Sequence, residues 1–264
     1  MTTVRAAGHE LEYVWIGPPP ESAPTLVFLH EGLGSVSLWR DVPASLAERT
    51  GCSALVYSRW GHGRSDGLDG PRATTFMHDE ALVALPEVLH KLKVRHPILV
   101  GHSDGGSIAI IYAGAQRFPV SALILEAPHV FVEDLSVESI TRIKGTFETT
   151  DLPRRLARHH GANTETVFRG WNDVWLDPEF RRWNIDASLP AIQCPILVIQ
   201  GEDDEYGTMK QVEAIEARAG GPVEVLRLPA CGHAPHVDQR ERALDAMAAF
   251  IAAHQARAAD AARP

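Results

Sequence analysis

The chain has 264 residues, of which 45% are hydrophobic and 22% are charged, a composition typical of a globular protein and unlike a disordered or fibrous one. Its 25 Lys and Arg residues against 34 Asp and Glu residues give a formal net charge of −9 with neutral His. This balance argues against a protein that binds nucleic acid or an anionic membrane, because either activity needs a basic face.

The cysteines and the N-terminal segment indicate the cellular setting. Cys52, Cys194 and Cys231 form no Cys-x-x-Cys pair and no Cys/His ligand spacing, so neither a disulfide framework nor a metal site is predicted. Residues 1–10 are polar and lack the basic and apolar regions of a signal peptide, and no apolar run is long enough to span a bilayer. We therefore expect a cytoplasmic protein.

In chain order, the first expected element is a strand at residues 9–16, where apolar and polar residues alternate weakly. Gly17 and three prolines, Pro18–Pro20, follow it directly. Because proline is confined to the edges and ends of sheets, this segment is predicted to be an antiparallel strand in a hairpin at the sheet edge, ahead of a parallel core.

Six short apolar runs then recur along the chain, separated in most cases by segments with helical periodicity. The runs are rich in Val, Ile and Leu and do not alternate, as expected for strands of a parallel sheet that are buried on both faces. The pattern predicts an α/β fold with a doubly wound, mostly parallel sheet. The runs cover residues 25–29, 53–57, 97–100, 122–125, 195–199 and 223–228.

One connection is much longer than the others. About 70 residues separate Leu125 from Pro195, where a single crossover needs far fewer. Residues 128–189 are therefore predicted to form a mostly helical cap, inserted into a core made of residues 1–127 and 190–264. Most of the cap's aromatic residues are expected to hold it against the sheet, because aromatic side chains bury large areas. Trp171 and Trp175 are assigned to a substrate pocket.

The most informative segment is a strand-to-helix turn that reads Gly101-His-Ser-Asp-Gly105. A strand that reverses into a helix within one residue strains the residue at the apex, Ser103. Gly101 and Gly105 remove the side chains that would collide there. Such a turn presents the Ser103 hydroxyl above the sheet and places the N–H of Asp104 at a helix N-terminus, which favours an oxyanion. The alternative is a glycine-rich turn in which Ser103 only caps the helix.

A serine nucleophile needs a base and an acid that orients the base, and both are expected later in the chain. The loop after the fifth apolar run holds four carboxylates among eight residues, and the loop after the last run holds two histidines. Both loops lie at the carboxyl ends of strands, where open α/β sheets hold their sites. His233 is the predicted base, and His236 is expected either to support the site residues from behind or to line the substrate pocket. Spacing alone leaves Asp203 and Asp204 open as the acid.

From about Thr25 to Ile251, these segments resemble the α/β-hydrolase fold. In that family the acid usually stands three residues after the glycine that closes its strand, which implies Asp204. The family's oxyanion loop usually begins His-Gly, whereas this chain has His30-Glu-Gly-Leu-Gly. The resemblance implies that the N–H groups of Gly32 and Asp104 form the oxyanion hole. Glu31 either redirects this loop or brings its carboxylate into the pocket, and both roles stay open.

The resemblance also implies the reaction. We expect a serine hydrolase that cleaves a small apolar or aromatic carboxylic ester through a Ser103 acyl-enzyme, with His233 as base and Asp204 as orienting acid. Dehalogenases and epoxide hydrolases of this fold carry aspartate at the turn, so Ser103 argues against both. A small-molecule substrate is the only expected partner, and no cofactor is expected.

Three other functions stay open. A thioesterase is favoured by a basic patch on the cap, which would meet a CoA phosphate. A solvated helix face explains the patch as well. The patch comprises Arg154, Arg155, Arg158, His159 and His160. Hydrolysis of a carbon–carbon bond in a vinylogous diketone uses the same three residue types in this fold. Some members are small-ligand receptors that keep the triad, because fold does not fix function.

Overall fold

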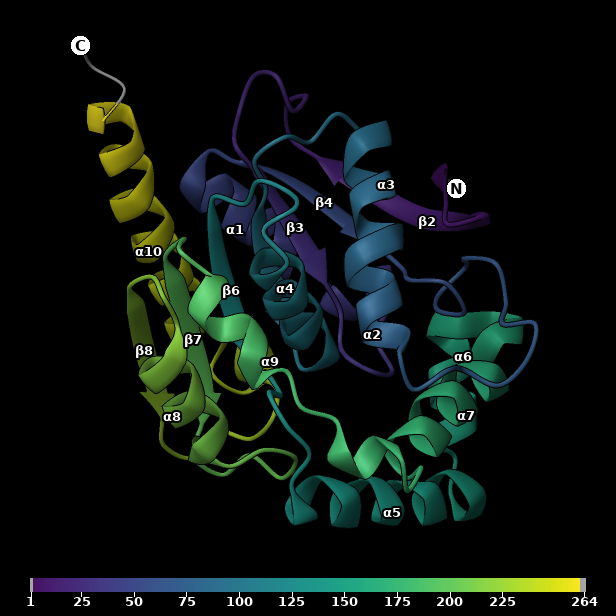
Figure 1. The fold of residues 1–264 in the computed structure, drawn as a ribbon. Helices are drawn as coiled ribbons and strands as arrows, with labels where there is room; N and C mark the ends of the chain where they lie inside the picture. Colours follow the sequence, from purple (N-terminus) through teal and green to yellow (C-terminus); the bar gives the residue numbers. More distant parts are fainter. Residues whose placement is uncertain (1, 262–264) are drawn as a thin grey trace.

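The computed structural model describes residues 2–261, which form a sheet of eight strands with helices on both faces (Figure 1). The strand order is β1-β2-β4-β3-β5-β6-β7-β8, and from β4 onward in this order neighbouring strands run parallel. The strands are β1 (Thr2–Ala6), β2 (His9–Ile16), β3 (Thr25–Leu29), β4 (Ser53–Tyr57), β5 (Ile98–His102), β6 (Ala122–Glu126), β7 (Ile196–Gly201) and β8 (Val223–Leu228).

The ten α-helices within residues 2–261 have these bounds: α1 (Val42–Thr50), α2 (Phe76–Asp79), α3 (Leu85–Lys91), α4 (Asp104–Gly114), α5 (Asp134–Thr149), α6 (Leu152–His160), α7 (Thr164–Trp175), α8 (Met209–Arg218), α9 (Pro235–Asp238) and α10 (Arg240–Ala261). A π-helical turn, Glu80–Ala84, joins α2 to α3. This alternation of strands and helices confirms the predicted doubly wound fold.

The sheet separates two apolar layers because side chains alternate across a strand. In β3, Leu26 and Phe28 pack in the layer that contains α1 and α10, whereas Val27 and Leu29 pack in the layer that contains α3, α4 and α8. All residues of β3 to β7 are buried, as expected for central parallel strands. The expectation is wrong for β8, where only Leu228 is fully buried, because β8 is an edge strand with one neighbour.

The N-terminal hairpin also differs from the prediction. Residues 9–16 do form an antiparallel strand, but this strand, β2, pairs with β1 on one side and β4 on the other. The edge is β1, which the sequence reading missed. Ala7 and Gly8 both have positive φ, 48° and 87°, which suits the right-handed twist of a tight hairpin.

Helices α5, α6 and α7 are inserted between β6 and β7 and lie together, apart from the sheet (Figure 1). Side chains from this insertion bond to the loop that follows β4. His160 Nδ1 accepts a hydrogen bond from the N–H of Gly63 at 2.9 Å, and Asn163 Nδ2 donates to the carbonyl of Ser65 at 2.8 Å. These bonds hold the insertion against one side of the core.

Among residues 2–261, no helix combines the length and the apolar character needed to cross a bilayer.

Candidate active site

Ser103 lies at the turn between β5 and α4 with φ 54° and ψ −117°, a backbone conformation that residues other than glycine rarely adopt. Steric contacts explain the glycines around it. A Cβ on Gly101 would lie 2.3 Å from the carbonyl oxygen of Gly105, and a Cβ on Gly105 would lie 1.9 Å from that of Leu29. The turn therefore requires glycine at both positions, as the sequence predicts.

His233 and Asp204 meet at the carboxyl edge of the sheet. The Nδ1 atom of His233 lies 2.9 Å from each carboxylate oxygen of Asp204. Asp203 is exposed and lies outside this contact. Of the two aspartates that spacing leaves open, Asp204 is therefore the one beside the imidazole. No hydrogen bond joins Ser103 to His233 within the described residues, and in ligand-free sites this contact is often long.

The surroundings of Asp204 favour its charged form. Its Oδ1 accepts hydrogen bonds from the N–H groups of Tyr206 at 2.7 Å and Gly207 at 3.2 Å, and its Oδ2 accepts one from Gln200 Nε2 at 2.7 Å. Burial alone would raise the pKa of Asp204, but His233 and the N–H of Tyr206 lower it to about 2. Asp204 is therefore an anion at neutral pH and holds the proton of His233 on Nδ1.

Ser103 and His233 line the same cavity of about 190 Å³. Three of the four predicted pocket residues, Glu31, Trp171 and Trp175, line it as well. The rest of the wall is formed by Gly32, Leu33, His129, Ser136, Ile140 and Tyr206.

The fourth predicted pocket residue, His236, does not line this cavity. Its Nδ1 lies 2.9 Å from Glu126 Oε2, and the Glu126 side chain is fully buried at the end of β6. Burial alone would lower the pKa of His236, but the carboxylate of Glu126 outweighs it and raises the pKa. His236 is thus turned inward by a buried carboxylate, a contact that its position in the sequence does not reveal.

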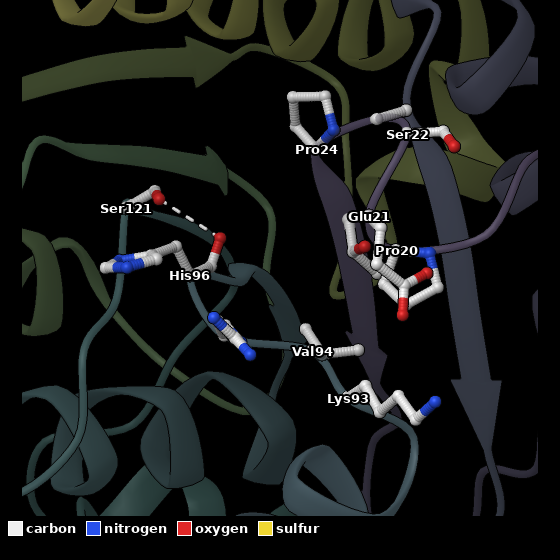
Figure 2. A pocket seen from close by; sticks show the side chains of 11 residues that line it. Pro20, Glu21, Ser22, Pro24, Lys93, Val94, His96 and Ser121 are labelled. Carbon is white, nitrogen blue, oxygen red and sulfur yellow. Dashed lines mark hydrogen bonds between the residues drawn. The ribbon is translucent and has the colours of Figure 1, made fainter. Parts of the chain in front are cut away.

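A larger cavity of about 690 Å³ lies at the opposite end of the sheet (Figure 2). It is lined by the segments that precede β3, β5 and β6, including Pro24, His96 and Ser121. Ser121 Oγ donates a hydrogen bond to the carbonyl of His96 at 3.1 Å (Figure 2). Parallel α/β sheets bind ligands at the carboxyl ends of their strands, so the smaller cavity at Ser103 is the candidate active site.

The two predicted oxyanion donors are available. Within residues 2–261, the N–H groups of Gly32 and Asp104 have no hydrogen-bond acceptor, and Asp104 is the first residue of α4. A Cβ on Gly32 would lie 2.1 Å from Trp171, so glycine is needed for this tryptophan to cover the loop. Arg59 Nη2 donates a hydrogen bond to the carbonyl of Glu31 at 2.8 Å and so helps to fix the backbone of this loop.

The side chain of Glu31 reaches the cavity. Its side chain is 29% exposed, and its Oε2 lies 3.7 Å from Nδ1 of His102. Burial alone would raise the pKa of Glu31, but the facing imidazole of His102 outweighs burial and holds the pKa well below its usual range. The cavity therefore contains a carboxylate beside the candidate oxyanion hole.

Sequence reasoning missed two histidines. His102 precedes Ser103, and its Nε2 lies 2.7 Å from the carbonyl oxygen of His233; since a carbonyl only accepts, Nε2 donates and fixes the loop that carries His233. His129 follows β6 by three residues, lines the cavity and is 2% exposed. The position of His102 inside the serine turn is a signal that was available, whereas nothing in the sequence marks His129.

Asp104 connects the serine turn to the inserted helices. Its Oδ1 accepts a hydrogen bond from Trp175 Nε1 at 3.2 Å, and both side chains are buried. Burial raises the pKa of Asp104, although the charge of Arg59 and the bond from Trp175 oppose this effect. A tryptophan of the cavity wall is thereby positioned by the residue next to Ser103.

The basic residues of α6 do not form a patch at the candidate active site. His160 is buried, with its Nε2 2.9 Å from the carbonyl oxygen of Leu33. Arg154 and Arg155 are exposed and pair with Asp151. None of these side chains lines the candidate active site. Among the described residues, no group of His, Cys, Asp and Glu has an arrangement suited to a metal ion.

Comparison with known proteins agrees with this fold. A model described as the alpha/beta hydrolase family matches residues 26–249. The chain belongs to this family.

Three of the similar proteins are hydrolases of different kinds. The chain is 30% identical over 136 residues to the sn-1-specific diacylglycerol lipase of Danio rerio, a match that covers 50% of this chain and only 41% of that protein. It is 31% identical over 235 residues to the proline iminopeptidase of Lactobacillus helveticus, covering 75% and 79% of the two chains. The structure of an esterase from Exiguobacterium antarcticum matches with a TM-score of 0.74 at 21% identity, covering 95% and 98%. The chain is accordingly a hydrolase enzyme.

Proposed function

We propose that this protein is a serine hydrolase that cleaves a small apolar or aromatic carboxylic ester through an acyl-enzyme on Ser103. The observation that carries the proposal is the contact of His233 Nδ1 with both oxygens of Asp204, 2.9 Å each, because His233 lines the same cavity as the strained Ser103. This arrangement leaves Nε2 of His233 as the basic nitrogen.

In the first half of the reaction, Nε2 of His233 takes the proton of Ser103 while Oγ attacks the ester carbonyl. The N–H groups of Gly32 and Asp104 donate to the oxyanion that forms. The imidazolium then gives its proton to the alcohol oxygen as the ester C–O bond breaks. In the second half, water attacks the acyl-enzyme, His233 takes its proton, and Ser103 regains a proton as the carboxylic acid leaves.

The size and walls of the cavity support a small substrate. Its volume of about 190 Å³ is below the roughly 300–1,000 Å³ of sites for drug-sized ligands. Ile140, Trp171 and Trp175 supply apolar walls. A short aliphatic or single-ring acyl group suits this space better than a long lipid chain.

A second candidate is cleavage of an amide next to a free amino terminus. It is favoured by the carboxylate of Glu31 in the cavity, which suits an ammonium group, and by the similarity to a proline iminopeptidase. A thioesterase has less support, because the exposed arginines of α6 lie outside the cavity wall. No contact in the cavity wall specifically favours carbon–carbon bond hydrolysis or a receptor role over ester hydrolysis.

The test is a p-nitrophenyl ester series of increasing chain length, with prolyl p-nitroanilide and acyl-CoA substrates in parallel. We expect short esters to be cleaved fastest, and Ser103→Ala to abolish both turnover and labelling by a fluorophosphonate probe. Ser121→Ala, at the other end of the sheet, is the matched control and keeps full activity. A folded wild-type protein that neither turns over any substrate nor reacts with the probe would refute the acyl-enzyme and favour a receptor.

A further inference from the structure

His129 is a buried polar side chain in the cavity wall, beside Trp175 and His233. Its ring packs edge-on against Trp175, with ring centroids 5.0 Å apart, and lies 5.6 Å from the ring of His233. The residue is 2% exposed, and its Nδ1 is buried without a hydrogen-bond partner among the described residues. An unpaired buried nitrogen costs stability that a phenylalanine of similar shape would not.

The fold does not use the polarity of this side chain. The backbone carbonyl of His129 accepts a hydrogen bond from Ser107 Oγ at 2.6 Å, and any residue would supply that carbonyl. On the ring, Nδ1 faces Gly207, where a Cβ would lie 3.5 Å away. Nε2 also makes no hydrogen bond among the described residues, but unlike Nδ1 it is not fully buried, so Nε2 is the nitrogen left for a ligand in the cavity.

The ring is uncharged in the working enzyme. Burial, followed by the charge of His233, lowers the pKa of His129 to about 3. It is therefore neither a second cation nor a second base for Ser103 at neutral pH. A neutral imidazole accepts through one nitrogen and donates through the other, so either tautomer offers one hydrogen bond to the cavity.

We propose that His129 is a specificity-determining residue that hydrogen-bonds a hydroxyl group on the acyl part of the substrate. A hydroxyl both donates and accepts, so it pairs with either tautomer of the ring. An anionic acyl group would be repelled by Glu31 and Asp204, whose charges lie at the same site.

The inference rests on the proposed ester hydrolysis and narrows its substrate class to short hydroxyacyl esters. His129 and Ser103 line one cavity of about 190 Å³, so the hydroxyl lies within a few carbons of the scissile carbonyl. The residue acts in binding, and the reaction steps of Ser103 and His233 are unchanged by it.

The experiment compares kcat/KM for p-nitrophenyl butyrate with both enantiomers of p-nitrophenyl 3-hydroxybutyrate and with the lactate ester. The wild-type enzyme is expected to prefer one hydroxyacyl ester about tenfold or more, because a site built to bind a hydroxyl rejects the analogue that lacks it. In His129→Phe the preference falls to about one, because the ring keeps its shape and loses its hydrogen-bonding nitrogens. His129→Gln keeps part of the preference, and the exposed His90→Gln is the matched control.

The outcomes separate this inference from the proposed function. If butyrate is cleaved but no hydroxyacyl ester is preferred, or if His129→Phe and His129→Gln slow all esters equally, His129 has a structural role and the inference is wrong while ester hydrolysis stands. If no ester is cleaved, the proposed function fails and the inference fails with it. Thermal unfolding of each variant shows whether it is folded; if His129→Phe does not fold, the ratio in His129→Gln decides, and an unchanged ratio refutes the inference.

Discussion

Asp204, whose carboxylate lies beside His233, is the residue whose role can be tested most directly. Asp204 accepts three further hydrogen bonds and holds the Nδ1 proton of His233, whereas the neighbouring Asp203 is exposed. Asp204→Asn replaces an acceptor with an amide and favours the wrong tautomer of the imidazole. We expect kcat to fall by about 10³-fold or more, measured with the best p-nitrophenyl ester.

Asp203→Asn is the matched control for this variant. It changes an adjacent carboxylate of the same loop and should leave kcat within about twofold, as exposed substitutions usually do. A comparable loss in both variants would show that the loop, and not the charge at position 204, carries the effect.

At the scale of elements, one hydrogen bond links the inserted helices to the serine turn. Trp175 at the end of α7 donates to Asp104 at the start of α4. Trp175→Phe leaves the buried Oδ1 of Asp104 without its partner, so we expect the free energy of unfolding to drop by about 2 kcal/mol. The wall of the cavity loosens as well, and KM for short esters rises.

Trp183 offers a control from the same aromatic cluster. Its ring lies 6.2 Å from that of Trp175, and its Nε1 is buried with no hydrogen-bond partner among the described residues. Trp183→Phe makes the same change to a partly buried ring and removes no hydrogen bond, so urea denaturation should show a smaller loss than for Trp175→Phe. Equal losses would mean that ring packing, and not the bond to Asp104, holds α7 in place.

For the whole molecule, buried neutral histidines make stability depend on pH. Burial lowers the pKa of His30, His62, His129 and His160. In the unfolded chain these groups bind protons near pH 6.5, whereas the folded chain binds them only at lower pH. Below pH 6.5 the unfolded state therefore binds more protons, and stability falls as the pH falls. His236 has a raised pKa and contributes in the opposite direction.

Urea denaturation at pH 7.5, 6.5 and 5.5 measures this dependence. The urea concentration at the midpoint of unfolding is expected to decrease between pH 6.5 and pH 5.5. His129→Phe should make this decrease smaller, because it removes one of the titrating groups. A midpoint that stays constant over this range would contradict the buried, neutral state of these histidines.

The predictable part of this protein is local in sequence. The runs at residues 25–29 and 53–57 form β3 and β4 with unchanged bounds, because apolar content and β-branching act within a few residues. The same holds for the turn at Ser103, where the need for Gly101 and Gly105 arises from the backbone itself. The edge strand β1 escaped prediction because its pairing with β2 is a tertiary contact of a polar, weakly patterned segment.

What the sequence by itself determined is the strand and helix order, the strained serine turn, and the loops that carry Asp204 and His233, since each depends on periodicity and sterics between near neighbours. The tertiary structure alone decided which neighbouring acid meets His233, how His236 turns toward Glu126, and that His129 lies neutral in the cavity wall. The physical reason is that hydrogen-bond partners and burial come from segments distant in the chain. The sequence separations of 29 between Asp204 and His233 and of 110 between Glu126 and His236 are bridged only when the sheet brings its strand ends together.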